Sequence, residues 1–222
     1  MTLTQLIALF RQEADDVVAP YLFSDTAVTG WLNEAVEEAC VRALLVKDWT
    51  TSAVCSIAVA AGTSTYNAHA SIINITRAAF MVDGGSDSAV LYQTTEFELD
   101  RLQPGWRDET GEPDSFIHHD TKIRLGCIPE SAGTLSLEVN RIPLALMATG
   151  TDVPEIASRH HRTLVQWALF RAFSVPDSEV VDPNKAAMAE REFTKMFGLR
   201  MDATTRREHE TSMPHRNAAI WL

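Results

Sequence analysis

Two histidine pairs are the residues of this chain best suited to metal or acid–base chemistry: His118-His119 and His160-His161. Imidazole nitrogens bind zinc and exchange protons near neutral pH, so these pairs could serve a metal-dependent hydrolase. His118 and His119, followed by Asp120, stand at the end of a predicted strand, where neighbouring side chains point to opposite faces. His160 and His161 begin a predicted helix, where neighbours do not face one another. Neither pair has the i, i+4 spacing of helical zinc sites, so we interpret both as surface or partly packed histidines.

Other catalytic signatures are missing from the sequence. Gly84-Gly85 is a turn signal without a following Lys-Ser or Lys-Thr, and no Gly-x-Ser-x-Gly motif occurs. The carboxylates between Asp108 and Asp114 flank Pro and Gly residues, which favours a solvated acidic loop over a glycosidase pair. We therefore expect no catalytic residue, no metal and no cofactor.

The bulk properties exclude several classes of protein. The 222 residues carry a formal net charge of −11, which disfavours a regulator that grips DNA phosphates. The same charge is compatible with a wall that surrounds DNA and lets it slide. The sequence has no apolar run long enough to span a membrane and no export signal at its start. Cys40, Cys55 and Cys127 are odd in number and widely spaced, and we expect them to be buried, unpaired thiols in a reducing compartment.

Helical periodicity dominates the start of the chain. Apolar residues from Leu3 to Val17 repeat at helical spacing, and Pro20 is expected to end this helix. Ser24 or Asp25 then caps a second helix, whose apolar stripe ends near Ala43. The pattern predicts two antiparallel helices joined by a short turn.

The helical period returns near the end of the chain. Leu164 to Ala172 form a strongly apolar helix, and Asp182-Pro183 begins another that could stop at Gly198 or run on past Leu199. Between the two helical regions the sequence is rich in strand formers and turns, with one helical patch at Thr95–Leu102. The expected strands are Val54–Val59, Ile72–Val82, Ser115–Ile117, Lys122–Leu125 and Thr134–Val139.

These patterns predict an α+β fold, in which N- and C-terminal segments form a helical bundle with an inserted antiparallel β subdomain and an extended C-terminal tail. Residues 1–50 are expected to form an N-terminal helical hairpin and residues 51–150 the β subdomain. Residues 151–208 complete the bundle, and residues 209–222 form a docking tail.

Basic residues gather in the C-terminal region of this acidic chain. They are either solvated helix residues that pair with Glu190, Glu192 and Glu208, or a contact face for an acidic partner or a neighbouring subunit. The residues we consider for such a contact are Arg191, Lys195, Arg200, Arg206 and Arg207.

The chain ends on apolar residues. Exposed apolar surface usually marks an interaction site, so we expect this tail to insert into a groove of a partner. The alternative is a tail folded back on its own core. The candidate docking residues are Met213, Pro214, Ala219, Ile220, Trp221 and Leu222.

Several short motifs follow one another in a characteristic order along nearly the whole chain. They are Leu6-Ile7-Ala8-Leu9-Phe10-Arg11, Ser24-Asp25, Trp31-Leu32-Asn33-Glu34-Ala35, Gly62 with Tyr66, Ile72-Ile73-Asn74-Ile75, Pro104-Gly105-Trp106, Gly111-Glu112-Pro113-Asp114-Ser115-Phe116, Leu135 to Val139-Asn140-Arg141-Ile142-Pro143, Pro154-Glu155-Ile156, His161, Leu164-Val165, Ala168, Arg171-Ala172-Phe173, Glu192-Phe193 and Phe197-Gly198. This order resembles the head-to-tail adaptor (connector) proteins of tailed bacteriophages, including the gatekeeper-type tail-tube adaptors of short-tailed phages.

The resemblance implies a structural virion protein at the head–tail junction, made in the host cytoplasm. Such adaptors form a ring, typically of twelve copies, below the portal, and extend the DNA channel without binding DNA specifically. The implied partners are the portal protein, further copies of the chain, and downstream tail or nozzle proteins. C-terminal segments of this family commonly reach into the portal ring, which fits the apolar end of this chain. No cofactor and no membrane are implied.

Three alternatives remain at the level of the sequence. A tail-completion or neck protein would share the class but would contact the tail tube. A metal-dependent hydrolase would use His118, His119, His160 or His161. A DNA-binding regulator is opposed by the net charge.

Overall fold

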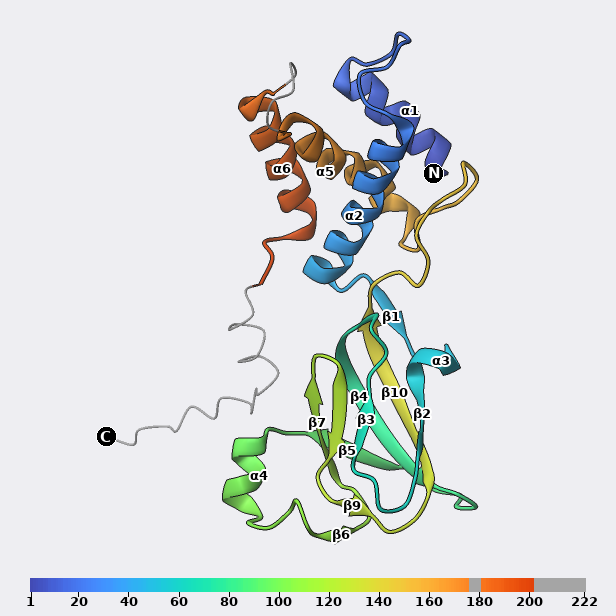
Figure 1. The fold of residues 1–222 in the computed structure, drawn as a ribbon, viewed down its shortest axis with the longest axis vertical. Helices are drawn as coiled ribbons and strands as arrows, with labels where there is room; N and C mark the ends of the chain where they lie inside the picture. Colours follow the sequence, from blue (N-terminus) through green and yellow to red (C-terminus); the bar gives the residue numbers. More distant parts are fainter. Residues whose placement is uncertain (176–180, 202–222) are drawn as a thin grey trace, which may run out of the picture. The chain divides into compact units, whose positions relative to one another are not determined.

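The computed structural model describes residues 1–175 and 181–201, and these form a mixed α+β fold of two compact units. One unit contains Met1–Asp48 together with Asn140–Arg200, and the other contains Trp49–Val139. Helices make up most of the first unit, and a curled sheet makes up most of the second (Figure 1). No helix in the described part of the chain is long and apolar enough to cross a membrane.

The first helix of the helical unit, α1 (Leu3–Ala14), is fixed at both ends by local hydrogen bonds. Thr2 and Gln5 form a capping box at its start. At its end Asp15 adopts a left-handed conformation, φ 59°, and the amide of Asp16 donates to the Arg11 carbonyl at 2.9 Å. The helix therefore stops before the expected Val17–Pro20 region, because the cap at Asp15 closes it first.

The next helix, α2 (Asp25–Ala43), begins where the sequence predicts. The Ser24 hydroxyl accepts a hydrogen bond from the Ala27 amide at 3.2 Å, which confirms Ser24 as the N-cap. Leu44 ends the helix in a left-handed conformation.

The C-terminal helices of this unit pack on each other. A 3₁₀ turn (Ser158–His160) leads into α5 (His161–Phe173), and α6 (Pro183–Phe197) is capped by Asp182. Of the two expected ends of α6, the structure has the one at Gly198. The Trp167 and Phe193 rings lie 4.9 Å apart between the two helices. Helix α5 also packs on α1 and α2, so it is the central element of the helical unit.

The β unit contains most of one large sheet and two small helices. The elements are β1 (Val46–Asp48), α3 (Ser52–Cys55), β2 (Ser56–Val59), β3 (Thr65–Asn67), β4 (Ile72–Val82), β5 (Ala89–Gln93), α4 (Glu96–Leu102), β6 (Thr110–Gly111), β7 (Ser115–His119), β8 (Lys122–Leu125), β9 (Ile128–Pro129) and β10 (Gly133–Arg141). The strand order of the large sheet is β1-β10-β4-β5-β7-β8-β3, and β2 also pairs with β10. A second, two-stranded sheet pairs β6 with β9.

Two features of the β unit differ from the prediction. The pairs β5–β7 and β6–β9 are parallel, so the sheet is not purely antiparallel. The long connection through α4 permits the parallel β5–β7 pair, because it returns the chain to the starting edge. The segment at Val54 is also a helical turn, α3, instead of part of a strand.

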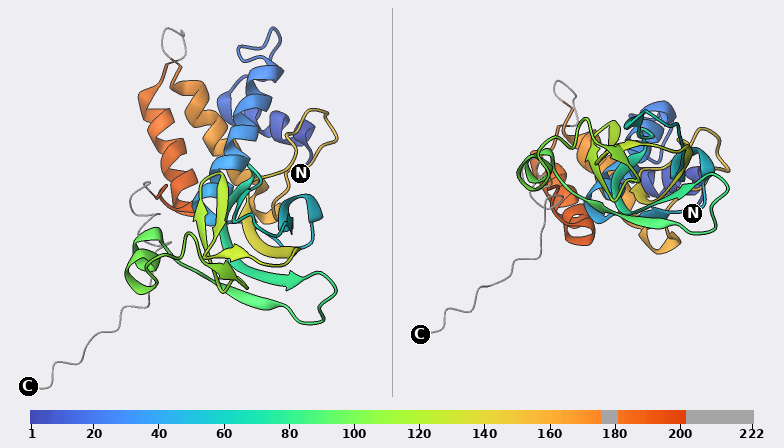
Figure 2. Two further views of the ribbon diagram at one scale, coloured as in Figure 1. Left: turned by 60° about the horizontal axis from the view of Figure 1, so that its bottom comes forward. Right: turned by 90° about the horizontal axis from the view of Figure 1, so that it is seen from below.

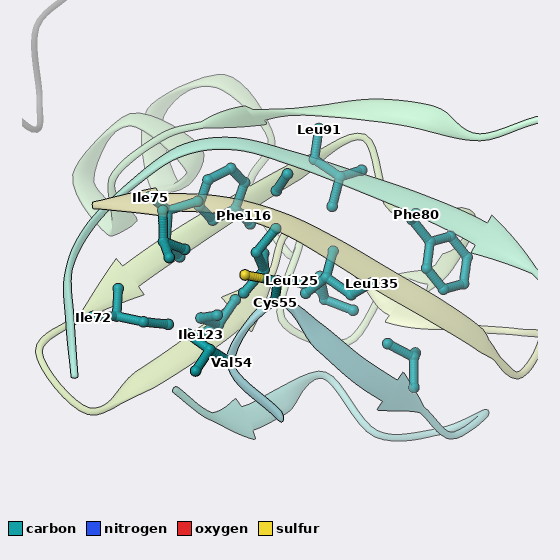
Figure 3. Close-up of a cluster of buried hydrophobic side chains, with 14 residues drawn as sticks. Val54, Cys55, Ile72, Ile75, Phe80, Leu91, Phe116, Ile123, Leu125 and Leu135 are labelled. Atoms are coloured by element: carbon teal, nitrogen blue, oxygen red, sulfur yellow. The ribbon is translucent and has the colours of Figure 1, made fainter. Parts of the chain in front are cut away.

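The strands curl around a hydrophobic core, as Figures 2 and 3 show. The core includes Val54 and Cys55 of α3 together with Phe80, Phe116 and Leu135 from the strands. Cys40, Cys55 and Cys127 are all buried, as predicted, and none of them forms a disulfide. Burial raises the pKa of the Cys40 thiol to about 12, so this thiol stays protonated and unreactive.

Candidate partner-binding surfaces

The histidine pairs lie in different units and have different environments. In the β unit, His119 is exposed with its Nε2 3.8 Å from a carboxylate oxygen of Glu96, while burial lowers the pKa of the neighbouring His118. In the helical unit, His160 packs on Phe197, and burial lowers its pKa as well. Within residues 1–175 and 181–201, no three His, Cys, Asp or Glu side chains group as metal ligands would.

His161 is buried and holds neighbouring segments of the helical unit together. Its Nε2 lies 3.0 Å from the Ile156 carbonyl, which can only accept, so Nε2 carries the proton. The Nδ1 atom therefore accepts from the Met1 amine at 2.7 Å. This geometry gives His161 a structural role beside the Pro154-Glu155-Ile156 segment.

Arg141 is buried and forms an ionic cluster with the buried Asp48 and the exposed Glu155 in the helical unit. Its Nε donates to Asp48 at 2.7 Å, and its Nη1 donates to Glu155 at 3.0 Å. A second guanidinium nitrogen bonds the other Glu155 oxygen, so that pair is bidentate. Glu155 also accepts from the Leu144 amide at 3.0 Å. One side chain thus joins β1, the end of β10 and the segment that leads to α5.

A second buried cluster shapes the α1–α2 loop, which we define as Asp15–Ser24. The buried guanidinium of Arg11 donates to Asp16 at 2.7 Å and to the Phe23 carbonyl at 3.2 Å. The Asp16 carboxylate accepts from the amides of Leu22 and Phe23 at 2.8 and 3.2 Å. Arg11 also stacks on the Tyr21 ring, 3.6 Å from its centroid. These contacts fix the two ends of the loop in one geometry.

The α1–α2 loop exposes a group of apolar side chains. Val18 is 76% exposed, and Val17, Tyr21 and Leu22 are each about half exposed. Apolar side chains on a loop held by a buried ion pair are typical of a preorganised contact surface. The sequence pattern missed this surface, because Val17 continues the helical period of α1. The signal that could have found it was Asp15-Asp16 before an apolar run that contains Pro20.

A second mixed surface lies on α6. We define the outer face of α6 as Met188, Arg191 and Lys195, which follow one another at three- and four-residue spacing. All three are exposed, with Met188 at 70%, and Leu199, just beyond the end of the helix, is 79% exposed. The buried residues of this helix lie on its opposite side: Ala186, Ala189, Phe193 and Phe197. Met188 and Met196 are apolar residues of the same helix, but both are exposed.

A shallow groove between α5 and α6 adjoins this outer face. Its volume is about 380 Å³, and it is lined by Arg162, Thr163, Gln166, Glu192, Lys195 and Met196. Both charged and apolar atoms line it, as is common where a partner side chain docks.

The predicted basic residues are only partly free to bind a partner. Lys195 lies 3.8 Å from Glu192, and Arg200 lies 3.3 Å from Glu38, while Arg191 is exposed on the outer face of α6. The remaining predicted residues lie outside the described part of the chain: Arg206, Arg207, Met213, Pro214, Ala219, Ile220, Trp221 and Leu222.

The β unit presents its own exposed apolar residues around α4. Phe97 is 77% exposed, and Tyr92 and Leu102 are also mostly exposed. Helix α4 is held by Trp106, which is buried with Leu99 and donates to Asp100 at 2.8 Å. The apolar side chains of α4 that face solvent are therefore carried by an anchored helix.

Comparison with known proteins gives one strong match. No curated protein matches the chain. The model of the SU10 adaptor protein family matches residues 1–218, which includes both units and the surfaces described above. The chain therefore belongs to the SU10 adaptor protein family.

Proposed function

We propose that the chain is a head–tail adaptor of a tailed bacteriophage that forms a ring, typically of twelve copies, below the portal. The ring extends the DNA channel and provides the docking surface for tail components. The observation that carries this proposal is the family match over residues 1–218, because the family consists of phage adaptor proteins. Membership of an adaptor family makes the chain a structural component of the virion.

The construction of the molecule supports a role in binding more than one partner. Each unit has a core of its own, and each exposes apolar side chains on an anchored segment. The helical unit offers the α1–α2 loop and the outer face of α6, while the β unit offers α4 with Phe97. Separate surfaces on separate units suit a protein that contacts copies of itself and other components.

The charge of the chain supports the channel role. A net charge of −11 gives the ring a surplus of carboxylates, which repel the phosphates of passing DNA. DNA would then pass without specific binding.

The C-terminal tail is the part we assign to the portal. Its apolar residues Ile220, Trp221 and Leu222 would bury in a groove of the portal ring. The β unit would then contact downstream tail or nozzle proteins.

A truncation tests the assignment of the tail. A chain that lacks Ser212–Leu222 is compared with the full chain for binding to the portal ring, by sedimentation of the complex. We expect the truncated chain to remain folded and to lose portal binding, since it loses one Trp and two aliphatic side chains. Unchanged portal binding would show that another surface docks on the portal. Failure of even the full chain to bind would favour a tail-completion protein.

A further inference from the structure

The two mixed surfaces of the helical unit lie on different flanks of it. Helix α5 lies between α1 and α6 in both Figures 1 and 2, so the α1–α2 loop and the outer face of α6 do not compete for one partner. A head-to-tail ring needs two different surfaces of this kind on each subunit.

The charges of the two surfaces are of opposite sign. Asp15, Asp16 and Asp25 are the only charged residues from position 15 to position 25. Asp16 is buried, and both Asp16 and Asp25 pair with Arg11, so Asp15 and the excess of carboxylates over this one arginine give the loop its negative charge. The outer face of α6 carries Arg191 and Lys195 beside Met188; Lys195 lies 3.8 Å from Glu192, and Arg191 supplies the excess positive charge. An acidic, apolar loop and a basic, apolar helix face therefore complement each other in both polarity and charge.

The loop is preorganised, and a groove adjoins the outer face of α6. The loop projects Val17, Val18 and Leu22, and its geometry is already fixed by the Arg11–Asp16 ion pair. The α5–α6 groove, of about 380 Å³, shares Lys195 with the outer face of α6 and has room for apolar side chains. Little conformational entropy would be lost on docking, because the loop is preorganised.

We propose that the α1–α2 loop of one copy docks on the outer face of α6 of the next copy, and that this contact joins neighbouring subunits of the ring. The inference rests on the proposed ring-forming function and identifies the surfaces that make the ring. Val18 and Met188 are the central residues of the two sides, since each is largely exposed on its surface.

Disulfide crosslinking of the full chain tests this contact. The double variant Val18→Cys/Met188→Cys is loaded on the portal ring and oxidised, and the products are separated without reductant. The three native cysteines are buried and do not interfere. We expect a ladder of covalent multimers, because the cysteine at position 18 of each copy can bond one neighbour and the cysteine at position 188 can bond the other. Either single variant should give no ladder, and Leu146→Cys/Met188→Cys is the matched control, since Leu146 is an exposed residue of the same unit.

Loading without a ladder overturns the inference, and crosslinks to the portal chain overturn it as well, because the loop then has a different partner. Failure of the unmodified chain to load on the portal contradicts the proposed function itself. As a second measurement, Val18→Asp should weaken loading about tenfold, and Leu146→Asp should leave it within about twofold. Equal loading of both Asp variants would also overturn the inference.

Discussion

The ionic cluster of Arg141 shows how one side chain can join distant segments of the helical unit. Asp48 and Arg141 are both buried, and they come from segments 93 residues apart in the chain. A buried ion pair contributes little net free energy compared with apolar residues, but removing one member leaves an uncompensated charge. We expect the cluster to contribute mainly to the specificity of the arrangement.

Replacing this arginine should have a large effect on stability. Arg141→Ala removes the guanidinium partner of the buried Asp48, and we expect the free energy of unfolding to fall by about 3 kcal/mol. Urea denaturation followed by circular dichroism measures the loss. The control is Arg77→Ala, because Arg77 forms an exposed pair with Glu138 at 3.5 Å and should cost at most about 1 kcal/mol. Equal losses in both variants would contradict a structural role for the Arg141 cluster.

The same cluster predicts how stability depends on pH. The hydrogen bonds from Arg141 lower the pKa of the Glu155 carboxyl below its value in the unfolded chain. The contribution of Glu155 is therefore fully present above the unfolded pKa, about 4.3, and is lost as the pH falls through the folded pKa.

A glutamine variant isolates this contribution. We expect the difference in unfolding free energy between the wild type and Glu155→Gln to shrink as the pH decreases from about 5. Urea titrations at a series of pH values give this difference. A difference in unfolding free energy that is independent of pH would show that the charge of Glu155 does not contribute to the stability of the folded chain.

At the scale of helices and strands, replacing either of two glycines by alanine is expected to change the stability of the fold, in opposite directions. Gly133, in β10, has no room, because a Cβ there would overlap the Met81 carbonyl oxygen and lie 2.7 Å from the Phe80 ring. Because one of these neighbours is backbone, Gly133→Ala should destabilise the β unit by about 1–3 kcal/mol. A Cβ at Gly30, in α2, would have nothing within 4 Å, so Gly30→Ala should stabilise by about 0.5–1 kcal/mol. Urea denaturation of both variants checks the signs, and a stabilised Gly133→Ala would contradict the described packing.

The beginnings of the helices could be predicted because their signals are local. Ser24 and Asp182 cap their helices through side-chain bonds to amides two or three residues away. Strand direction is different, since side chains alternate in the same way in parallel and antiparallel pairs. The parallel pairing of Tyr92 with Ser115 depends on the α4 connection, which the alternation does not encode.

In several places the structure depends on tertiary packing and not on the local sequence pattern. Val54 and Cys55 are neighbours and both belong to the core, which a helical turn allows and a strand would not. Met188 and Met196 fit a helical period, but only one side of α6 packs on α5, and both methionines are exposed. The candidate surfaces were hard to predict for the same reason, because exposure of an apolar residue depends on what packs around it.

For the whole molecule, we propose an adaptor with separate contacts for its copies and its partners. The helical unit carries the two surfaces assigned to the ring, and residues 212–222 are assigned to the portal. The β unit, with Phe97 on α4, is assigned to the tail side. An acidic chain of this kind would leave DNA free to move through the ring.

The decisive measurement for the adaptor proposal is the mass of the chain in solution, determined by light scattering alone and then with the portal ring. We predict that the chain adds to the portal in a fixed multiple, as an adaptor ring assembled on its template would. A portal ring whose mass does not change after mixing with the chain would contradict the proposed adaptor function.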